Sequence, residues 1–275
     1  MAYTSGTAAN YKELLSTLAT FAAANGWAIM EQSADKLYLR GEGSAGVDEI
    51  YCGISAFENT VSGYYNWELF GAWTYRAGRA FNVMPRSANG VYVYLWNSPI
   101  TYWMVATPRR IIMVAKIGTV YQTMHLGGID PIGTEAQYPY PLLIAGCGSV
   151  WNQNYSVTGD NNRSFWSDST VTCGKLSTPG GYWQNVNAST IKAVSASTEL
   201  RASILSGLDG TYMLEQKFLT DNNQSTTYGA IDGLFLVSGH NNSSENIVSY
   251  GGINYMVFQD VYRVGVGDYC ALRMN

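Results

Sequence analysis

The sequence predicts an α+β, β-rich fold, in which an N-terminal helix is followed by antiparallel strand meanders around a central hairpin, with a long irregular excursion. Three observations predict this class. Residues 1–26 carry apolar side chains at helical spacing, and from Trp27 onward apolar residues recur with the period of two that is typical of strands. An apolar run, Ile111–Ile117, lies near the middle of the chain. Because we find no proline-rich or charged linker, residues 1–275 are interpreted as one body.

The central hairpin, Tyr102–Gly128, is the segment around which we expect the rest of the chain to be organised. Thr107–Arg110 predicts a turn, because proline fixes φ at the first central position. Ile111–Ile117 lacks clean alternation and is broken only by Lys116, which indicates a strand covered on both faces, with a buried helix as the alternative. A strand here would bury two sets of side chains, namely Ile111, Met113 and Ala115 on one face and Ile112 and Val114 on the other.

Two segments flank this run. Tyr102–Ala106 is its expected hairpin partner. Thr119–Leu126, on the other side, is amphipathic enough to predict a short helix that Gly127 and Gly128 would close.

The N-terminal part, residues 1–26, predicts a helix with one apolar face. Thr7 is expected to cap it, and Asn25-Gly26 is expected to end it. The apolar stripe consists of Tyr11, Leu14, Leu15, Leu18 and Phe21.

Residues 27–150 form the expected central β-rich part. Hairpin arms are predicted at Trp27–Glu31 and Lys36–Arg40, and two further strands at Glu49–Phe57 and Tyr64–Phe70. In Val91–Trp96 three aromatic residues, Tyr92, Tyr94 and Trp96, are expected to project to one side. Such a stripe is typical of a sugar-stacking surface, of a subunit contact or of a core.

Residues 151–199 differ in composition from the rest of the chain and are interpreted as a loop-rich excursion. They are rich in Asn, Ser, Thr and Gly, with few aliphatic residues, above all in Asn152–Ser189. Long surface loops often carry recognition residues. We therefore take Trp166 and Trp183, together with the aromatic stripe, as candidate subunit or ligand contacts.

Residues 200–275 return to a regular pattern of antiparallel strands, with a tight hairpin at Gly251-Gly252. The expected strands are Tyr212–Leu219, Ile231–Ser238, Ile247–Tyr250, Ile253–Phe258, Val261–Val264 and Asp268–Met274.

Composition favours a protein with large subunit contacts. Hydrophobic residues make up 47% of the chain and charged residues 13%, with 21 tyrosines and 8 tryptophans. Aromatic side chains give a large contact area for little entropy, and charge is depleted at buried surfaces. An ordinary β-rich monomer is the alternative.

A net charge of −4 argues against a nucleic-acid partner, and no apolar run has the length of a membrane span. We see no signal peptide and expect synthesis in the cytoplasm.

The sequence predicts no catalytic, cofactor-binding or metal-binding residues. The cysteines Cys52, Cys147, Cys173 and Cys270 are widely spaced and form no zinc motif, so we expect partly buried thiols, with oxidation of any close pair outside the cell as the alternative. Of the two histidines, His125 is expected to be packed or partly exposed. His240 lies near Ser244 and Glu245, but no nucleophile-elbow motif supports a triad.

Gly41, Gly43 and Gly46 have the spacing of a dinucleotide-binding loop, yet a strand rather than a helix is predicted after them. A polysaccharide hydrolase would need two carboxyl groups in one cleft.

Several segments resemble a family of virion structural proteins of tailed bacteriophages. They are Asp48–Tyr51, Tyr64–Gly71, Leu95–Ala106, Arg109–Lys116, Tyr138–Leu142, Gly239–Asn246 and Tyr269–Arg273. The resemblance implies a non-enzymatic, multi-copy homo-oligomer in the virion, assembled in the host cytoplasm with other virion proteins in the tail, neck or baseplate region. It supplies no catalytic residue. The alternative function is a tail-tip or surface module that binds a host cell-surface glycan.

Overall fold

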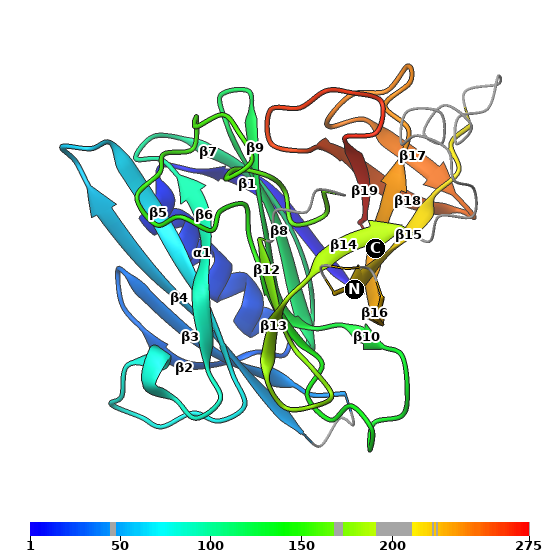
Figure 1. Ribbon diagram of the computed structural model, residues 1–275. Helices are drawn as coiled ribbons and strands as arrows, with labels where there is room; N and C mark the ends of the chain where they lie inside the picture. Colours follow the sequence, from blue (N-terminus) through cyan, green and yellow to red (C-terminus); the bar gives the residue numbers. More distant parts are fainter. Residues whose placement is uncertain (45–47, 168–172, 191–210, 222, 224, 275) are drawn as a thin grey trace.

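The computed structural model describes residues 1–275 except 45–47, 168–172, 191–210, 222, 224 and 275. The described chain forms three layers of antiparallel sheet (Figure 1). We call them the N-terminal, central and C-terminal sheets. The β-rich α+β prediction is confirmed, with one helix near the N-terminus followed by antiparallel sheets. In the described part of the chain, no helix has the length and apolar character needed to cross a membrane.

The central sheet is the middle layer, and the other two sheets pack on its opposite faces. Its strand order is β1 (Ala2–Ala8), β7 (Ile100–Thr107), β8 (Arg110–Ile117), β9 (Val120–Gly128), β11 (Leu142–Ala145), β12 (Gly174–Ser177) and β13 (Trp183–Asn185). The N-terminal sheet contains β2 (Ala28–Gln32), β3 (Lys36–Glu42), β4 (Glu49–Asn59), β5 (Tyr64–Ala72) and β6 (Ala88–Leu95), with the 3-10 helix η1 (Phe81–Val83) before β6. The C-terminal sheet runs β14 (Asn187–Thr190), β15 (Glu215–Thr220), β16 (Thr227–Val237), β19 (Tyr269–Arg273), β18 (Ile253–Gln259) and β17 (Ile247–Tyr250), and β10 (Asp130–Pro131) pairs with β16.

The helix α1 (Tyr11–Ala24) begins later than predicted, because a strand precedes it. Asn10, not Thr7, is the N-cap, and its side chain accepts hydrogen bonds from the backbone of Lys12 and Glu13. Thr7 instead lies in β1, which pairs with β7. The seven residues of β1 show little apolar pattern, so pairing with a distant strand, which local sequence cannot reveal, determines their conformation. The helix ends before Asn25-Gly26 as predicted, with Gly26 at φ +91°.

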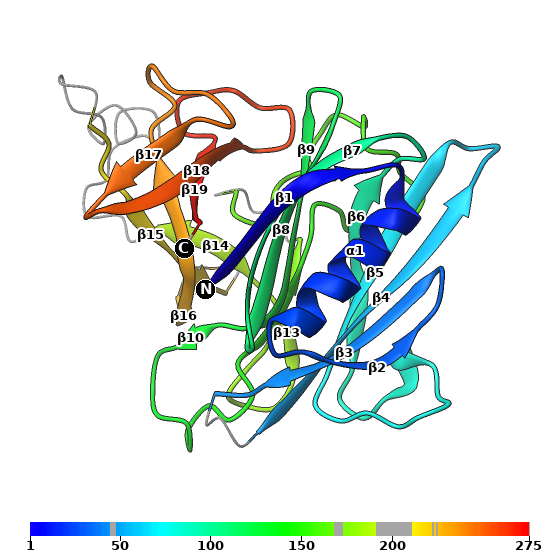
Figure 2. The same ribbon diagram turned by 180° about the vertical axis from the view of Figure 1, so that it is seen from behind.

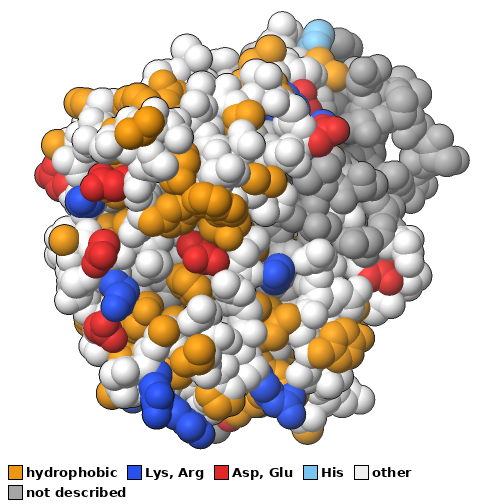
Figure 3. Space-filling view, turned by 60° about the vertical axis from the view of Figure 1, so that its left-hand side comes forward, with side chains coloured by type: hydrophobic (Ala, Val, Ile, Leu, Met, Phe, Trp, Pro, Cys, Tyr) orange, Lys and Arg blue, Asp and Glu red, His pale blue; other side chains and the backbone are white. Residues whose placement is uncertain are grey.

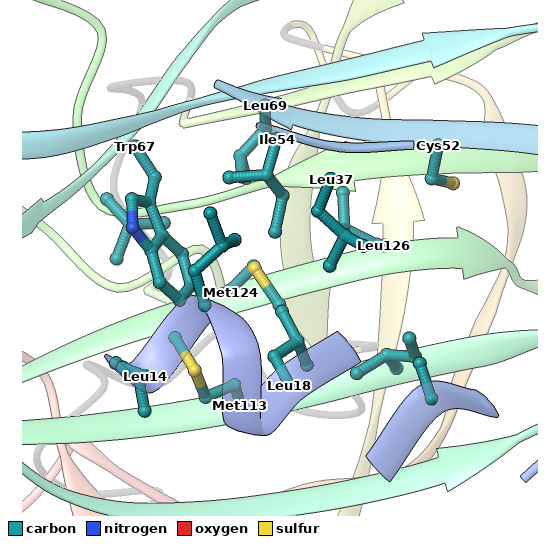
Figure 4. Packing of buried hydrophobic residues seen from close by; sticks show 14 of the residues in the cluster. Leu14, Leu18, Leu37, Cys52, Ile54, Trp67, Leu69, Met113, Met124 and Leu126 are labelled. Carbon is teal, nitrogen blue, oxygen red and sulfur yellow. The ribbon is translucent and has the colours of Figure 1, made fainter. Parts of the chain in front are cut away.

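Strand β8 is buried on both faces, as the sequence predicted. Ile111, Met113 and Ala115 belong to a core with α1 and the N-terminal sheet. Ile112 and Val114 belong to a second core with the C-terminal sheet. Figure 4 shows the first core, where Leu14 and Leu18 of α1 and Met113 and Met124 of the central sheet lie near Trp67, Ile54 and Leu69 of the N-terminal sheet. The predicted turn and hairpin partner are also confirmed, since β7 pairs with β8 from Thr101–Lys116 to Thr107–Arg110.

The predicted helix at Thr119–Leu126 is wrong, because this segment is β9. A tight turn at Gly118, with φ +62°, lets Ile117 pair with Val120. Two of the polar residues that suggested an amphipathic helix, Gln122 and Thr123, are in fact buried and hydrogen-bonded. Gln122 Nε2 donates to Asn162 Oδ1 at 3.1 Å, and the backbone N–H of Thr123 donates to Cys147 Sγ at 2.9 Å. Hydrogen bonds to residues distant in the sequence therefore allow polar side chains to be buried in a strand that is covered on both faces.

The excursion is more ordered than its composition predicted. It contributes β12 and β13 to the central sheet and β14 to the C-terminal sheet, so it connects two layers. Its residues 168–172 and 191–199 lie outside the described residues.

The strand predicted at Val261–Val264 is wrong. This segment forms a turn, with Val261 at φ +55° and an isolated bridge between Asp260 and Arg263.

The double-sided burial of β8 yields a stability prediction for Ile112→Ala. Ile112 is fully buried, so truncation should lower the free energy of unfolding by about 2–5 kcal/mol. Val61→Ala is the matched control, because Val61 is 96% exposed and should change stability little. Chemical denaturation of both purified variants measures the difference. Equal stability of the two variants would contradict a packed position for Ile112.

Candidate functional site

The predicted aromatic stripe of β6 is only partly exposed. Tyr92 is half-buried, and its hydroxyl donates to Glu68 Oε1 at 3.4 Å. Tyr94 is fully buried and donates to the carbonyl of Val150 at 2.7 Å, so it cannot contact a second molecule in this structure. Trp96 lies beyond the end of β6, where strand alternation stops. It packs edge-on against Tyr65, with ring centroids 5.1 Å apart.

Trp166 is also unavailable as a contact, because it is buried in the core between the central and C-terminal sheets. A buried carboxylate, Asp260, binds the backbone of Ser164, close to Trp166 in the sequence, and anchors this part of the excursion. Asp260 Oδ1 accepts the backbone N–H of Ser164 at 2.5 Å, and Asp260 Oδ2 lies 3.5 Å from Arg263 and 3.7 Å from Arg163. Burial raises the pKa of the Asp260 carboxyl, while the Ser164 N–H and the arginines oppose that rise.

Trp183 is half-exposed and lines a surface pocket where β6 approaches β12 and β13. The pocket has a volume of about 490 Å³, and its lining residues are Ser87, Ala88, Asn89, Lys175, Trp183, Gln184 and Asn185. In the β12–β13 ladder Lys175 pairs with Asn185, and directly opposed residues share one face of a sheet. Both side chains therefore project to the face on which Trp183 also lies.

Trp183 has a fixed position in this pocket. Its Nε1–H donates to the carbonyl of Arg86 at 2.8 Å. Its ring lies against Gly71 of β5, where an added Cβ would come within 2.6 Å of the indole. Gly71 is thus required by close packing, and the contact connects the edge of the central sheet to the N-terminal sheet.

A polar network connects the pocket to β5. The Lys175 ammonium donates to the carbonyl of Asn89 at 2.6 Å, and Asn89 Nδ2 donates to Glu68 Oε1 at 3.0 Å. The backbone N–H of Gly90 donates to the same oxygen at 3.3 Å. Burial, followed by the charge and hydrogen bond of Glu68, raises the pKa of Tyr92 to about 12, so its hydroxyl remains a donor at neutral pH.

Both charged groups of this network keep hydrogen-bonding capacity. Among the described residues, none donates to Glu68 Oε2, and Lys175 uses one of its three N–H groups. The pocket therefore offers the ammonium donors of Lys175 and the side-chain amide of the exposed Asn185. The free carboxylate oxygen of Glu68 belongs to the adjoining network, outside the pocket lining.

An aromatic cluster continues from the pocket across the outer face of the N-terminal sheet. Phe57 contacts Tyr64 and Tyr92 edge-on, with both centroid distances at 6.1 Å. Trp151 from the excursion stands edge-on to Tyr64 at 5.8 Å and is 53% exposed. A view from the side of the N-terminal sheet shows hydrophobic side chains interspersed with acidic and basic ones (Figure 3). Rings beside polar groups make a surface on which flat, hydroxyl-bearing molecules can stack and form hydrogen bonds.

Glu68, Asn89 and Lys175 were missed by sequence reasoning, and only Tyr92 and Trp183 among the predicted contacts reach this surface. For Glu68 a signal was present, because charged residues are 13% of the chain and a lone charge on the predicted strand Tyr64–Phe70 is therefore unusual. What the sequence does not contain is the approach of β6 to β12, which are distant along the chain.

The other chemically reactive groups are held in structural roles. All four cysteines are free thiols, and they are buried rather than partly buried as predicted. Glu245 accepts hydrogen bonds from Lys116 at 2.5 Å and Tyr121 at 2.6 Å, and Ser244 donates to Gln259, so neither is aligned with His240. Within the described ranges, no cluster of three or more His, Cys, Asp or Glu residues could hold a metal ion.

Comparison with models of protein families and with curated proteins found no match.

His125 of β9 is fully buried, and its environment opposes protonation. Its Nδ1 lies 3.4 Å from the carbonyl of Leu143, and Nε2 has no hydrogen-bond partner within the described chain. Burial, followed by the nearby charge of Arg110, lowers the pKa of His125 to about 3.

Acid should therefore destabilise the fold through His125. Unfolding exposes an imidazole of ordinary pKa, about 6.5, so the unfolded state binds a proton that the folded state does not until about pH 3. From pH 7 to pH 5 this single group should remove about 2 kcal/mol of stability. Denaturant unfolding of His125→Gln at both pH values should show that much less pH dependence than the parent. His240→Gln, at the exposed histidine, is the control; equal pH dependence in all three proteins would contradict the assignment.

Proposed function

We propose that this chain is a non-enzymatic structural subunit of a tailed-bacteriophage particle, present as a multi-copy homo-oligomer in the tail or neck. The observation that carries the proposal is where the segments resembling virion structural proteins lie in the fold. Tyr64–Gly71 lies in β5, Arg109–Lys116 in the hairpin and β8, and Tyr269–Arg273 is β19. These strands belong to all three sheets, so the resemblance concerns residues that build the framework.

The surface supports a role in assembly. Several large hydrophobic side chains are more than half exposed on the described surface, which favours contacts with other molecules when they lie close together. They include Trp151, Tyr182, Met213, Ile247 and Tyr250. Ile247 and Tyr250 lie on the same edge strand, β17, which has no charged residue. With 13% charged residues overall, little electrostatic repulsion opposes close packing of copies.

The test is the composition of the particle. Mass spectrometry of purified virions of the phage that encodes this chain should find the polypeptide in several copies per particle. Quantification against a labelled standard of the chain gives the copy number. Intact, infectious virions without this polypeptide would refute the proposal.

A second candidate function, recognition of a host cell-surface glycan, is favoured by the pocket at Trp183. Burial of Trp166 removes one of the two tryptophans first considered for such a role. The remaining surface still combines an indole and ammonium donors around a cavity of about 490 Å³, and the Glu68 carboxylate lies in the adjoining hydrogen-bond network. Sugars bind through these groups, with ring faces on aromatics and hydroxyls on polar atoms.

Glycan binding should depend on Lys175. Lys175→Ala removes the ammonium that faces the pocket and should weaken binding of purified host surface polysaccharide about tenfold, equivalent to about 1.4 kcal/mol. Lys12→Ala, an exposed lysine on α1, is the matched charge control. Calorimetric titration measures both, and melting curves check that each variant is folded. Unchanged affinity in a folded Lys175→Ala protein would exclude this pocket as the glycan site.

A further inference from the structure

Strand β1 forms an open edge of the central sheet. It pairs with β7 over all seven residues, from Ala2–Ala106 to Ala8–Ile100, with no register shift. No strand in the described part of the chain pairs with its other side. Figure 2 shows β1 at the near side of the central sheet, next to α1 and with no other element drawn in front of it. Backbone N–H and C=O groups of alternate residues therefore point outward along this edge.

This edge lacks the features that keep monomeric sheets apart. Natural edge strands are usually short, charged, bulged or interrupted by proline, which prevents pairing with other chains. The sequence of β1, Ala-Tyr-Thr-Ser-Gly-Thr-Ala, has no charge and no proline. Other edges differ, since β13 has three residues, β14 has four, and β2 contains Glu31 and an irregular register. β6 is long and uncharged, but its pairing with β5 has a register shift and Gly148 bridges to it at Tyr92. β17 is uncharged as well, but it has four residues.

We propose that β1 pairs antiparallel with β1 of a second copy of this chain across a two-fold axis, which joins two central sheets into one. The inference rests on the homo-oligomeric function proposed above and names the contact that forms the oligomer. A two-fold contact brings the same patch of each copy together, so a charge near the axis would face its own like charge. β1 has none. Its exposed, regular edge is therefore complementary to itself.

Full overlap of the seven residues fixes the register. Ala2 then pairs with Ala8 of the second copy, and Ser5 lies on the axis opposite its own counterpart. The side chain of Ser5 is exposed, whereas Tyr3, two residues away on the same face, packs against the core shared with the C-terminal sheet. Two Ser5 side chains would thus lie side by side at the junction.

The helix beside this edge leaves room for a second copy. Outside its first turn, the exposed residues of α1 are Ser16, Thr20, Ala23 and Ala24, which are all small and uncharged. The charged residues Lys12 and Glu13 lie in the first turn, and Glu13 Oε2 accepts the backbone N–H of Ala9 at 2.6 Å. Neither bulk nor charge on the rest of the helix therefore opposes the approach.

Cysteine cross-linking of the full chain tests the pairing. Opposed Cα atoms in an antiparallel ladder lie about 4.5–5.5 Å apart, within the range that a disulfide spans. The four natural cysteines are buried, so Ser5→Cys adds one accessible thiol. Mild oxidation should convert most of the Ser5→Cys protein into a covalent dimer of twice 30.1 kDa. Val61→Cys, whose site is 96% exposed in the β4–β5 loop, should stay largely monomeric on denaturing gels.

A charge variant gives the second readout. Ser5→Lys places two ammonium groups together on the axis and should shift the protein from dimer to monomer in light scattering. Val61→Lys adds the same charge elsewhere and should remain dimeric, and melting curves confirm folding. A parent protein that is monomeric at all concentrations would overturn the β1 pairing. So would an oligomer that survives Ser5→Lys and gives no Ser5→Cys cross-link, although the proposed virion role would then stand. Absence of the chain from virions, with cross-linking intact, would refute the virion role alone.

Discussion

Burial of β8 on both faces is the constraint on which the rest of the structure depends. Ile111 and Met113 complete the core that holds α1 and the N-terminal sheet, while Ile112 and Val114 complete the core under the C-terminal sheet. A strand with two apolar faces is stable only between two covering layers, because either face left open would expose a row of large side chains to water. The three-layer architecture follows from that requirement. The central sheet is a wall shared by two cores, so the outer sheets are coupled through it.

The parts of this architecture that sequence could predict are those with strong local patterns. The apolar run at Ile111–Ile117 indicated its two-sided burial, and the apolar stripe of α1 indicated the helix and its end at Asn25-Gly26. β1 and β9 were not predictable in the same way. Alternation in β1 is weak, and β9 carries Gln122, Thr123 and His125 in its buried interior. Partners far along the chain make both strands, and single-sequence patterns contain no information on them.

Even less of the candidate site than of the fold could be predicted from the sequence. Aromatic residues at strand spacing pointed to β6, yet burial separates Tyr92, which reaches the surface, from Tyr94, which does not. Loop 149–155 covers Tyr94 and Asn66 by accepting their hydrogen bonds through its backbone carbonyls. The decisive residues, Glu68 and Lys175, meet through Asn89 because two sheets come together at their edges. Composition indicated that charges are scarce, but their convergence is a property of the tertiary structure.

The excursion has a buried middle, which we call its anchor, and exposed segments around Trp151 and Tyr182, which we call its tips. Trp166 and the Asp260 network hold its middle inside the body, while Trp151 and Tyr182 stand exposed on either side of that anchor. Substitution at an exposed tip removes few packing contacts, whereas substitution at the anchor leaves a cavity or an unpaired buried charge. Selection can therefore change the tips rapidly without loss of the fold. Among chains that descend from a common ancestor with this one, divergence should concentrate at the tips, while the framework stays constant.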